Sequence, residues 1–312
     1  MKTYKFNLNL PDNITLKSSN TPFQRPYISK HFGATINRPS DFYRASLPAP
    51  FLPPTPRNTS RSKMSQVATS PAIPDPAFLK WPASASSEYI EARRALLDEE
   101  FALRNQIERV AAQRRALPPG PILPKYVFEE GPADLALDGP SRKICLGEVA
   151  GEGGKTLVLY HMMLRENAEE ACPSCSMFLD GLNGVAKHLA QRITFVVVAK
   201  APLEKLRGWA RKRGWANLRL LSSYGSDFNK DLGVERPAWF PELEQGPGMS
   251  VFRYEVEEGK PREEGVVRHL YTTTPHFAED VIRGMDLLSP VWNLLDLTPE
   301  GRGEWDARND TV

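Results

Sequence analysis

The sequence contains few cysteines, and none of its apolar runs is long. Three cysteines in 312 residues cannot build a disulfide framework, and this usage fits a reducing compartment where paired cysteines are catalytic or metal-binding. No stretch approaches the roughly 18 consecutive apolar residues of a membrane span. The N-terminus also lacks the charged-then-apolar plan of a secretory signal. We therefore expect a cytoplasmic protein without a membrane partner.

The chain also lacks a strong net charge, which is +2 overall. Charge is instead divided by region. Residues 1–63 hold ten of the 40 Lys and Arg but only two of the 38 Asp and Glu, so the rest of the chain is mildly acidic. A basic segment ahead of an acidic body argues against the body binding nucleic acid.

Residues 1–83 are rich in Pro, Ser, Thr and Asn, which predicts a disordered basic extension. Two interpretations of residues 1–63 remain open. The basic, hydroxyl-rich and acid-poor composition resembles a mitochondrial transit peptide. The alternative is an untranslated or unstructured extension with Met64 as the start, which the lack of a convincing amphipathic helix favours.

Residues 84–118 predict a long amphipathic helix that begins at a Ser87 cap and ends at Pro118. Its apolar residues fall on one face at helical spacing. They are Leu96, Leu103, Ile107, Val110 and Leu117. We expect this stripe to pack on the core of its own domain, although it could also form a homodimer or coiled-coil surface.

Alternating strands and helices fill residues 119–298, and residues 299–312 form a polar tail. The strand candidates are residues 126–128, 156–161, 193–199, 218–221, 249–254 and 266–272. The helix candidates are residues 172–191, 202–213 and 277–295, the last interrupted at Pro290. This order predicts an α/β, thioredoxin-like fold with a central mixed sheet flanked by helices and a long-helix extension at its N-terminal side.

The motif Cys172-Pro173-Ser174-Cys175 opens the first of these helices directly after a strand and loop. A helix N-terminus stabilises a thiolate, so Cys172 is the candidate nucleophile and Cys175 the resolving thiol. Pro173 presets the first helical turn, and Ser174 leaves room for a substrate disulfide. Half of a zinc site and two inert cysteines are the alternatives. Since no second Cys-x-x-Cys or His-x-His pair is present, we expect neither metal nor cofactor.

Other candidate residues follow strand ends. His161 ends the strand that leads to the dithiol, where it could handle protons or stabilise the thiolate, or serve as a structural histidine. Tyr224, Asp227 and Phe228 lie in the polar loop 222–229. Together with Tyr160 they could line a pocket, or the loop could simply cap a short helix.

Residues 92–304 resemble the thioredoxin-like domain-of-unknown-function family 899. The motifs that carry the resemblance are Arg114–Pro118, Tyr160–Met163, Cys172–Cys175, Ser222–Asn229, Ser250–Phe252, Leu295–Pro299 and Gly301–Arg302. The resemblance implies a dithiol–disulfide oxidoreductase that acts on a disulfide-containing substrate or a redox partner protein.

Two departures narrow this implication. Thioredoxins place a cis-proline directly before the strand that faces the dithiol, but here Gly248-Met249 begins that strand and Pro247 comes one place too early. Peroxiredoxins carry Pro-x-x-x-Thr-x-x-Cys, but residues 164–171 contain neither Pro nor Thr. General thioredoxin activity and fast peroxide reduction are therefore not expected.

The leading hypothesis is a thiol–disulfide oxidoreductase that uses Cys172 and Cys175. A non-catalytic binding or scaffold protein with the same fold is one alternative, favoured by the missing cis-proline and the long flanking helix. An enzyme with a small-molecule pocket near Tyr224 and Asp227 is the other.

Overall fold

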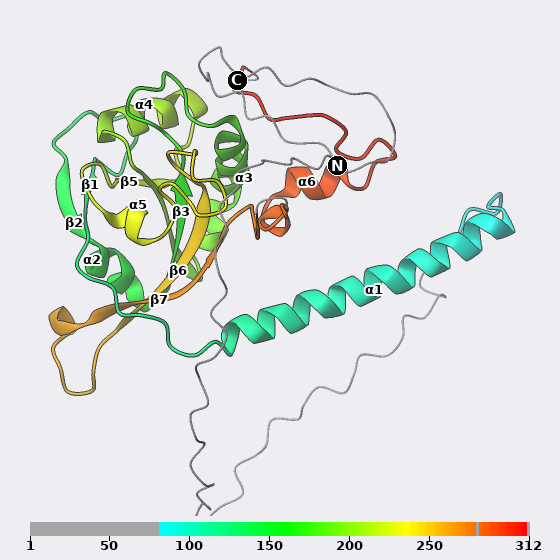
Figure 1. Ribbon diagram of the computed structural model, residues 1–312, viewed down its shortest axis with the longest axis horizontal. Coiled ribbons are helices and arrows are strands. Elements are labelled where there is room, and N and C mark those ends of the chain that lie inside the picture. Colours follow the sequence, from blue (N-terminus) through cyan, green and yellow to red (C-terminus); the bar gives the residue numbers. More distant parts are fainter. Residues whose placement is uncertain (1–80, 279–280, 311–312) are drawn as a thin grey trace, which may run out of the picture. The chain divides into compact units, whose positions relative to one another are not determined.

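A computed structural model describes residues 81–278 and 281–310 (Figure 1). Within these residues, no helix combines the length and the apolar character needed to cross a membrane. The predictions for the basic segment 1–63, and most of those for 1–83, concern residues outside the described part.

The centre of the fold is one mixed sheet in the strand order β2-β1-β5-β4-β3-β6-β7. The strands are β1 (Val127–Glu130), β2 (Arg142–Cys145), β3 (Thr156–Met162), β4 (Ile193–Ala199), β5 (Arg219–Ser222), β6 (Gly248–Glu255) and β7 (Val266–Thr273). Strands β3, β4 and β5 are parallel, whereas β6 and β7 continue the sheet antiparallel beyond β3. The β-branched run of β4 suits its place as a central strand covered on both faces.

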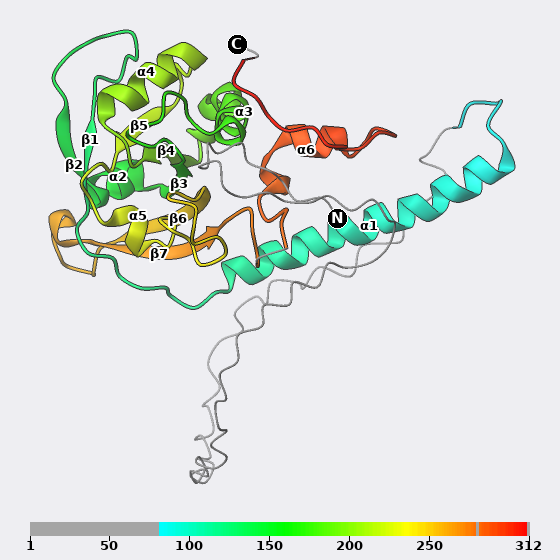
Figure 2. The ribbon, with the colours of Figure 1, turned by 45° about the horizontal axis from the view of Figure 1, so that its top comes forward.

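Six α-helices are present in the described residues. They are α1 (Ser87–Arg115), α2 (Leu146–Gly151), α3 (Pro173–Leu189), α4 (Leu203–Arg213), α5 (Phe228–Asp231) and α6 (Pro290–Leu295). Helices α3 and α4 connect the parallel strands and lie side by side, and the Trp209 indole N–H of α4 donates to Ser176 Oγ of α3 at 3.1 Å. Helices α2 and α5 lie on the other face of the sheet (Figures 1 and 2).

Alternation along β3 divides the core into two layers. Leu157, Leu159 and His161 point toward the α2 and α5 side, where His161 stacks on Phe228 with ring centroids 5.6 Å apart. Tyr160 points to the other side and stacks on Phe178 of α3 at 5.0 Å. Neighbouring residues of this strand therefore serve different layers.

The predicted α/β, thioredoxin-like fold class is confirmed. A helix that opens on the cysteine motif joins β3 to its parallel neighbour β4, and an antiparallel pair, β6 and β7, extends the sheet from the other side of β3. All seven strands and helices α2 to α6 fall within the predicted span 119–298.

Two parts of the predicted secondary structure are wrong. Strand β2 and helix α2 were not predicted, because each spans six residues or fewer and shows little periodicity. The predicted helix 277–295 is limited to a short 3-10 turn (Asp286–Leu288) and α6. A glycine explains part of the difference, since Gly284 packs directly against the backbone of Thr274, an approach that a side chain would prevent.

Helix α1 is present as predicted, but Ser86 rather than Ser87 caps it, with its Oγ accepting the Tyr89 N–H at 3.2 Å. The packing of its apolar stripe on the core stays a prediction. None of its residues is buried, and Leu103 is 57% exposed. Its few apolar residues form a narrow stripe between charged ones, too narrow to require burial.

The predicted polar tail 299–312 is polar but is not free. Arg302 forms ion pairs with Asp286 at 2.7 Å and with Asp296 at 2.8 Å. Further along, Asn309 is 7% exposed and bonds to the loop before α3. The chain after α6 is thus attached at both of these points.

Candidate functional site

Cys172 is the N-cap residue of α3, at the end of the loop that follows β3. Its backbone N–H donates to the Met163 carbonyl at 3.1 Å, and its carbonyl accepts the first helical bond from Ser176 at 3.0 Å. Pro173 occupies the first helical turn as predicted. Cys172 is partly exposed, Cys175 is 1% exposed, and both are free thiols. The structure therefore presents a dithiol in which Cys172 is the more exposed residue.

The surroundings of the two sulfurs separate their pKa values. A hydrogen bond from the Cys175 thiol, with backbone N–H groups of Cys175 and Ser174, lowers the pKa of Cys172 despite burial. Burial, and then the neighbouring Cys172 sulfur, raise the pKa of Cys175 well above its ordinary value. These shifts favour the charged form of Cys172 over that of Cys175.

Tyr160 joins the site from the sheet below α3. Its side chain is 2% exposed, and its hydroxyl bonds to the Cys175 sulfur. Burial raises the pKa of Tyr160 well above its usual range, so the phenol stays protonated and can donate. Tyr160 was predicted as a pocket residue, and the structure places it instead as a buried donor to Cys175.

His161 is not brought to the dithiol. It lies on the α2 and α5 side of the sheet, where its Nε2 bonds to Ser250 Oγ at 2.8 Å. Burial lowers its pKa to about 3, so the imidazole is neutral at ordinary pH. It therefore cannot supply a positive charge to the Cys172 thiolate, and the structural alternative fits this position.

The remaining candidate pocket residues do not gather with Tyr160. Phe228 is fully buried on the opposite side of the sheet. Asp227 is exposed at the start of the short helix α5. Tyr224 is half exposed, and its hydroxyl donates to the Glu166 carboxylate at 2.5 Å. The loop 222–229 thus starts a short helix, and through Tyr224 it contacts the loop that precedes the dithiol.

The loop before Cys172 is held in place by residues that were not predicted from the sequence. Asn309 Nδ2 donates to the Ala171 carbonyl at 2.8 Å and to Glu170 Oε2 at 3.1 Å. The buried Gln245 accepts the Leu164 N–H at 2.9 Å and donates to the Lys200 carbonyl at 3.1 Å. No sequence signal marks these contacts, because each joins segments more than 40 residues apart.

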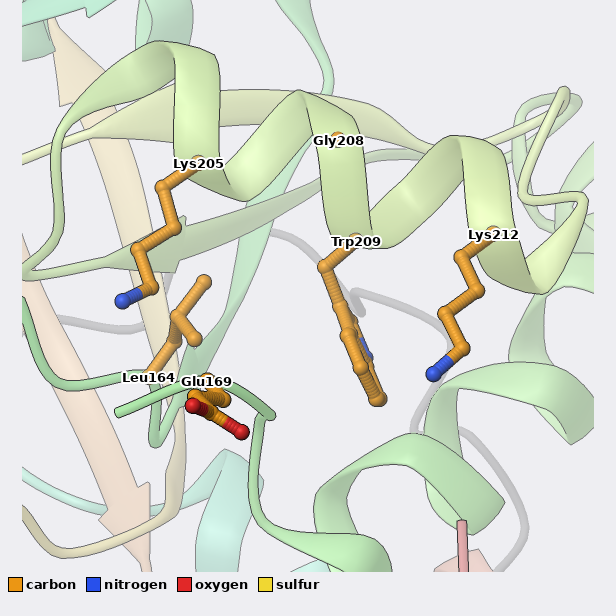
Figure 3. A pocket seen from close by; sticks show the side chains of 6 residues that line it. All are labelled: Leu164, Glu169, Lys205, Gly208, Trp209 and Lys212. Atoms are coloured by element: carbon orange, nitrogen blue, oxygen red, sulfur yellow. The ribbon is translucent and has the colours of Figure 1, made fainter. Parts of the chain in front are cut away.

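A cavity of about 270 Å³ opens between this loop and α4 (Figure 3). Its lining residues are Leu164, Glu169, Lys205, Gly208, Trp209 and Lys212. In Figure 3 the Lys205, Trp209 and Lys212 side chains all extend from α4 toward the side where Leu164 and Glu169 lie. The cavity is therefore formed by the same loop that leads into Cys172.

Two further features of the site concern the cis-proline of thioredoxins and the zinc-site alternative. All peptide bonds in the described part of the chain are trans, including the bond before Pro247, which precedes β6. Across residues 81–278 and 281–310, no group of three or more His, Cys, Asp or Glu side chains is arranged to hold a metal ion.

Several solved structures are similar to this chain at low identity. The reduced 2-Cys peroxiredoxin of Plasmodium vivax is 15% identical, with 54% of this chain and 91% of that chain covered and a TM-score of 0.36. Peroxidoxin BcpB of Mycobacterium tuberculosis is 19% identical, with 55% and 92% covered and a TM-score of 0.33. AhpC of the same organism is 12% identical, with 58% and 98% covered and a TM-score of 0.35.

No curated protein matches the chain. One protein-family model does match, over residues 80–311, and its description is a bacterial protein of unknown function, DUF899. The matched span includes the whole sheet, the dithiol and the attached C-terminal segment. Because this span is well over half of the sequence, the chain belongs to the DUF899 family.

Proposed function

We propose that this protein is a thiol–disulfide oxidoreductase in which Cys172 is the nucleophile and Cys175 the resolving thiol. The observation that carries the proposal is the place of the two cysteines: Cys172 is the partly exposed N-cap of α3, and Cys175 is buried one turn deeper in the same helix. The pKa of the more exposed cysteine is lowered, and that of the buried cysteine is raised. A structural pair of cysteines needs no such asymmetry.

The reaction follows from this arrangement. The Cys172 thiolate attacks one sulfur of a substrate disulfide, forms a mixed disulfide, and releases the other sulfur as a thiolate. Cys175 then loses its proton and attacks the Cys172 sulfur. This step closes the Cys172–Cys175 disulfide and releases the second substrate thiol. The substrate gains two electrons, and the protein loses two.

The roles of the two cysteines can be tested by single substitutions. Treatment with hydroxyethyl disulfide followed by mass spectrometry should show the loss of two hydrogens from the wild-type protein. Cys175→Ser should stop at a mixed disulfide on Cys172, and Cys172→Ser should react at less than a tenth of the wild-type rate. Cys145→Ser is the matched control and should behave as wild type.

Two results would contradict the proposal. One is wild-type protein in which both thiols can still be alkylated after this treatment. The other is a Cys172→Ser variant that reduces the disulfide at the wild-type rate.

A further inference from the structure

We propose that the cavity between α4 and the loop before Cys172 binds a short peptide-like thiol or disulfide that has a carboxylate near each end. This inference rests on the proposed function and names the substrate class of the same site. Three features of the cavity favour such a ligand: the spacing of its charges, its place beside the loop that leads to the dithiol, and its size.

The charges come from one stripe of α4. Lys205, Trp209 and Lys212 are four and three residues apart, so they share a helix face. The two lysines are seven residues apart, which puts their Cα atoms about 10.5 Å apart along the axis. Three extended residues span about 10 Å. A ligand of that length with a carboxylate at each end matches both ammonium groups.

Trp209 in the middle of the stripe and Glu169 of the facing loop offer further contacts to a ligand. The Trp209 ring lies between the lysines, and Lys212 Nζ is 4.9 Å from its centroid. Gly208 adds no side chain, and a Cβ there would have open space around it. Glu169 lines the opposite side of the cavity, where its carboxylate can accept a hydrogen bond from an ammonium group of the ligand. The site thus suits a zwitterionic ligand.

The lysines are available for such a ligand. Lys205 donates to the Glu166 carbonyl, and Lys212 forms an ion pair with Glu170 at 3.2 Å, in which both side chains are about half exposed. An ammonium group has three donors, so each lysine keeps donors for a carboxylate. The existing contacts fix the two ammonium groups at the edge of the cavity.

Hydrogen bonds connect the cavity to the dithiol. The Trp209 indole N–H donates to Ser176 Oγ at 3.1 Å, and the Ser176 hydroxyl donates to the Cys172 carbonyl at 3.2 Å. Leu164, at the other side, follows the residue whose carbonyl accepts the Cys172 N–H. A ligand in the cavity therefore lies against the loop that ends at Cys172 and against Trp209, which is bonded to the first turn of α3.

The size favours a small ligand over a protein. The cavity volume of about 270 Å³ is slightly below the roughly 300 Å³ at which the usual range for small-molecule sites begins. The chemistry is that of the proposed function. The Cys172 thiolate attacks a bound disulfide of this class. The ligand then leaves as two thiols, and the Cys172–Cys175 disulfide forms.

Binding can be measured without the reaction. The probe is S-methylglutathione, a thioether with a carboxylate at each end, titrated by calorimetry into the Cys172→Ser protein. Adding Lys205→Gln and Lys212→Gln should weaken binding at least tenfold, whereas adding Lys205→Arg and Lys212→Arg should keep it within threefold. Lys187→Gln, at an exposed site on α3, is the control and should have no effect.

Kinetics separate this inference from the proposed function. Glutathione disulfide should oxidise the wild-type dithiol at least ten times faster than its tetraester, and the double Lys→Gln variant should lose that preference. The neutral hydroxyethyl disulfide should react with both proteins within twofold. Equal rates for the acid and the ester overturn the inference alone. If no disulfide oxidises the dithiol, the proposed function fails and this inference fails with it.

Discussion

Cys172 and Cys175 are three residues apart, yet their sulfurs have opposite surroundings. Cys172 accepts hydrogen bonds at the helix start, which favours its charged form. Cys175 is one turn deeper, where burial favours its neutral form. Burial raises the pKa of Cys175, and the hydrogen bond that Tyr160 donates to its sulfur lowers this pKa, which makes the deprotonation of Cys175 easier. In the proposed reaction, we therefore expect the resolving step to depend on Tyr160, a residue of the sheet.

This dependence can be tested with Tyr160→Phe. The substitution keeps the ring stacked on Phe178 and removes only the hydroxyl, so the pKa of Cys175 should rise further. Loss of one hydrogen bond of about 1 kcal/mol should slow the resolving step about fivefold. Stopped-flow kinetics should show a longer-lived mixed disulfide on Cys172, with an unchanged first step. Tyr224→Phe, which removes an exposed hydroxyl, should change neither step; an equal effect from both substitutions would contradict this role.

The buried neutral state of His161 makes the stability of the fold depend on pH. Its folded-state pKa of about 3 lies below the unfolded value of about 6.5. The unfolded chain therefore binds the proton first, and stability present above about pH 6.5 is lost as pH falls toward 3. This one group should cost about 2 kcal/mol between pH 7 and pH 5.

Urea unfolding of His161→Asn at both pH values measures this contribution. The variant starts less stable, but its free energy of unfolding should fall by about 2 kcal/mol less than that of the wild type on going from pH 7 to pH 5. Burial also lowers the pKa of His269. Its contribution to the pH dependence of the free energy of unfolding should be the same in both proteins. The exposed His188→Asn should retain the full wild-type loss; a full loss in His161→Asn would show that this histidine is not buried as a neutral group.

At the scale of elements, α4 also holds the long loop between β1 and β2. Arg207 is 8% exposed, and its guanidinium donates to the carbonyls of Pro132, Asp134 and Leu137. Several carbonyls around one cation replace the regular hydrogen bonds that an irregular loop lacks. The helix that lines the cavity on one side thus fixes a loop on the other.

Arg207→Met tests this contact. The apolar stem is kept, but the loop carbonyls lose a charged donor, so the free energy of unfolding should fall by about 2–3 kcal/mol. Glu204→Met is the control on the same helix, because Glu204 is exposed and its replacement should cost less than about 1 kcal/mol. Chemical denaturation of both variants gives the comparison, and equal losses would contradict the special role of Arg207.

The C-terminal segment holds the loop before Cys172 in place. Asn309→Ala removes the donor to Ala171 and Glu170, and should cost about 1–2 kcal/mol in stability. Hydrogen exchange of amides 165–171 should become faster, and Cys172 should be alkylated more quickly. Asn167→Ala, an exposed substitution in the same loop, is the control. Unchanged exchange in Asn309→Ala would show that this loop keeps its position without the segment.

These elements also show which features a sequence can predict. Strand β4 and helix α3 were predicted closely because their signals are local: a β-branched run, and a Cys-Pro pair after a loop. The attachment of Asn309 to Ala171 joins residues 138 positions apart, so no local pattern contains it. His161 was predicted near the dithiol although alternation along β3 gives adjacent residues opposite faces. Its neighbour Tyr160 occupies the side that faces α3.

At the scale of the whole molecule, α1 differs from every other long element. Helices α3 and α4 each bury several side chains, whereas α1, the longest of the helices in the described residues, buries none. Most helical stability in proteins comes from packing of an apolar face rather than from propensity. The leucines of α1 therefore contribute little to the core formed around β3, and the domain should not depend on them.

Deleting residues 1–116 tests this independence. We expect the shortened protein to unfold in urea with a free energy within about 1 kcal/mol of the full chain, because no residue of α1 is fully buried. Oxidation of the dithiol by hydroxyethyl disulfide should proceed at the same rate in both proteins. A loss above about 2 kcal/mol that does not vary with protein concentration would show that α1 packs on its own domain after all. A loss that grows with protein concentration would instead show that a second copy covers the stripe, because association stabilises the folded state by mass action.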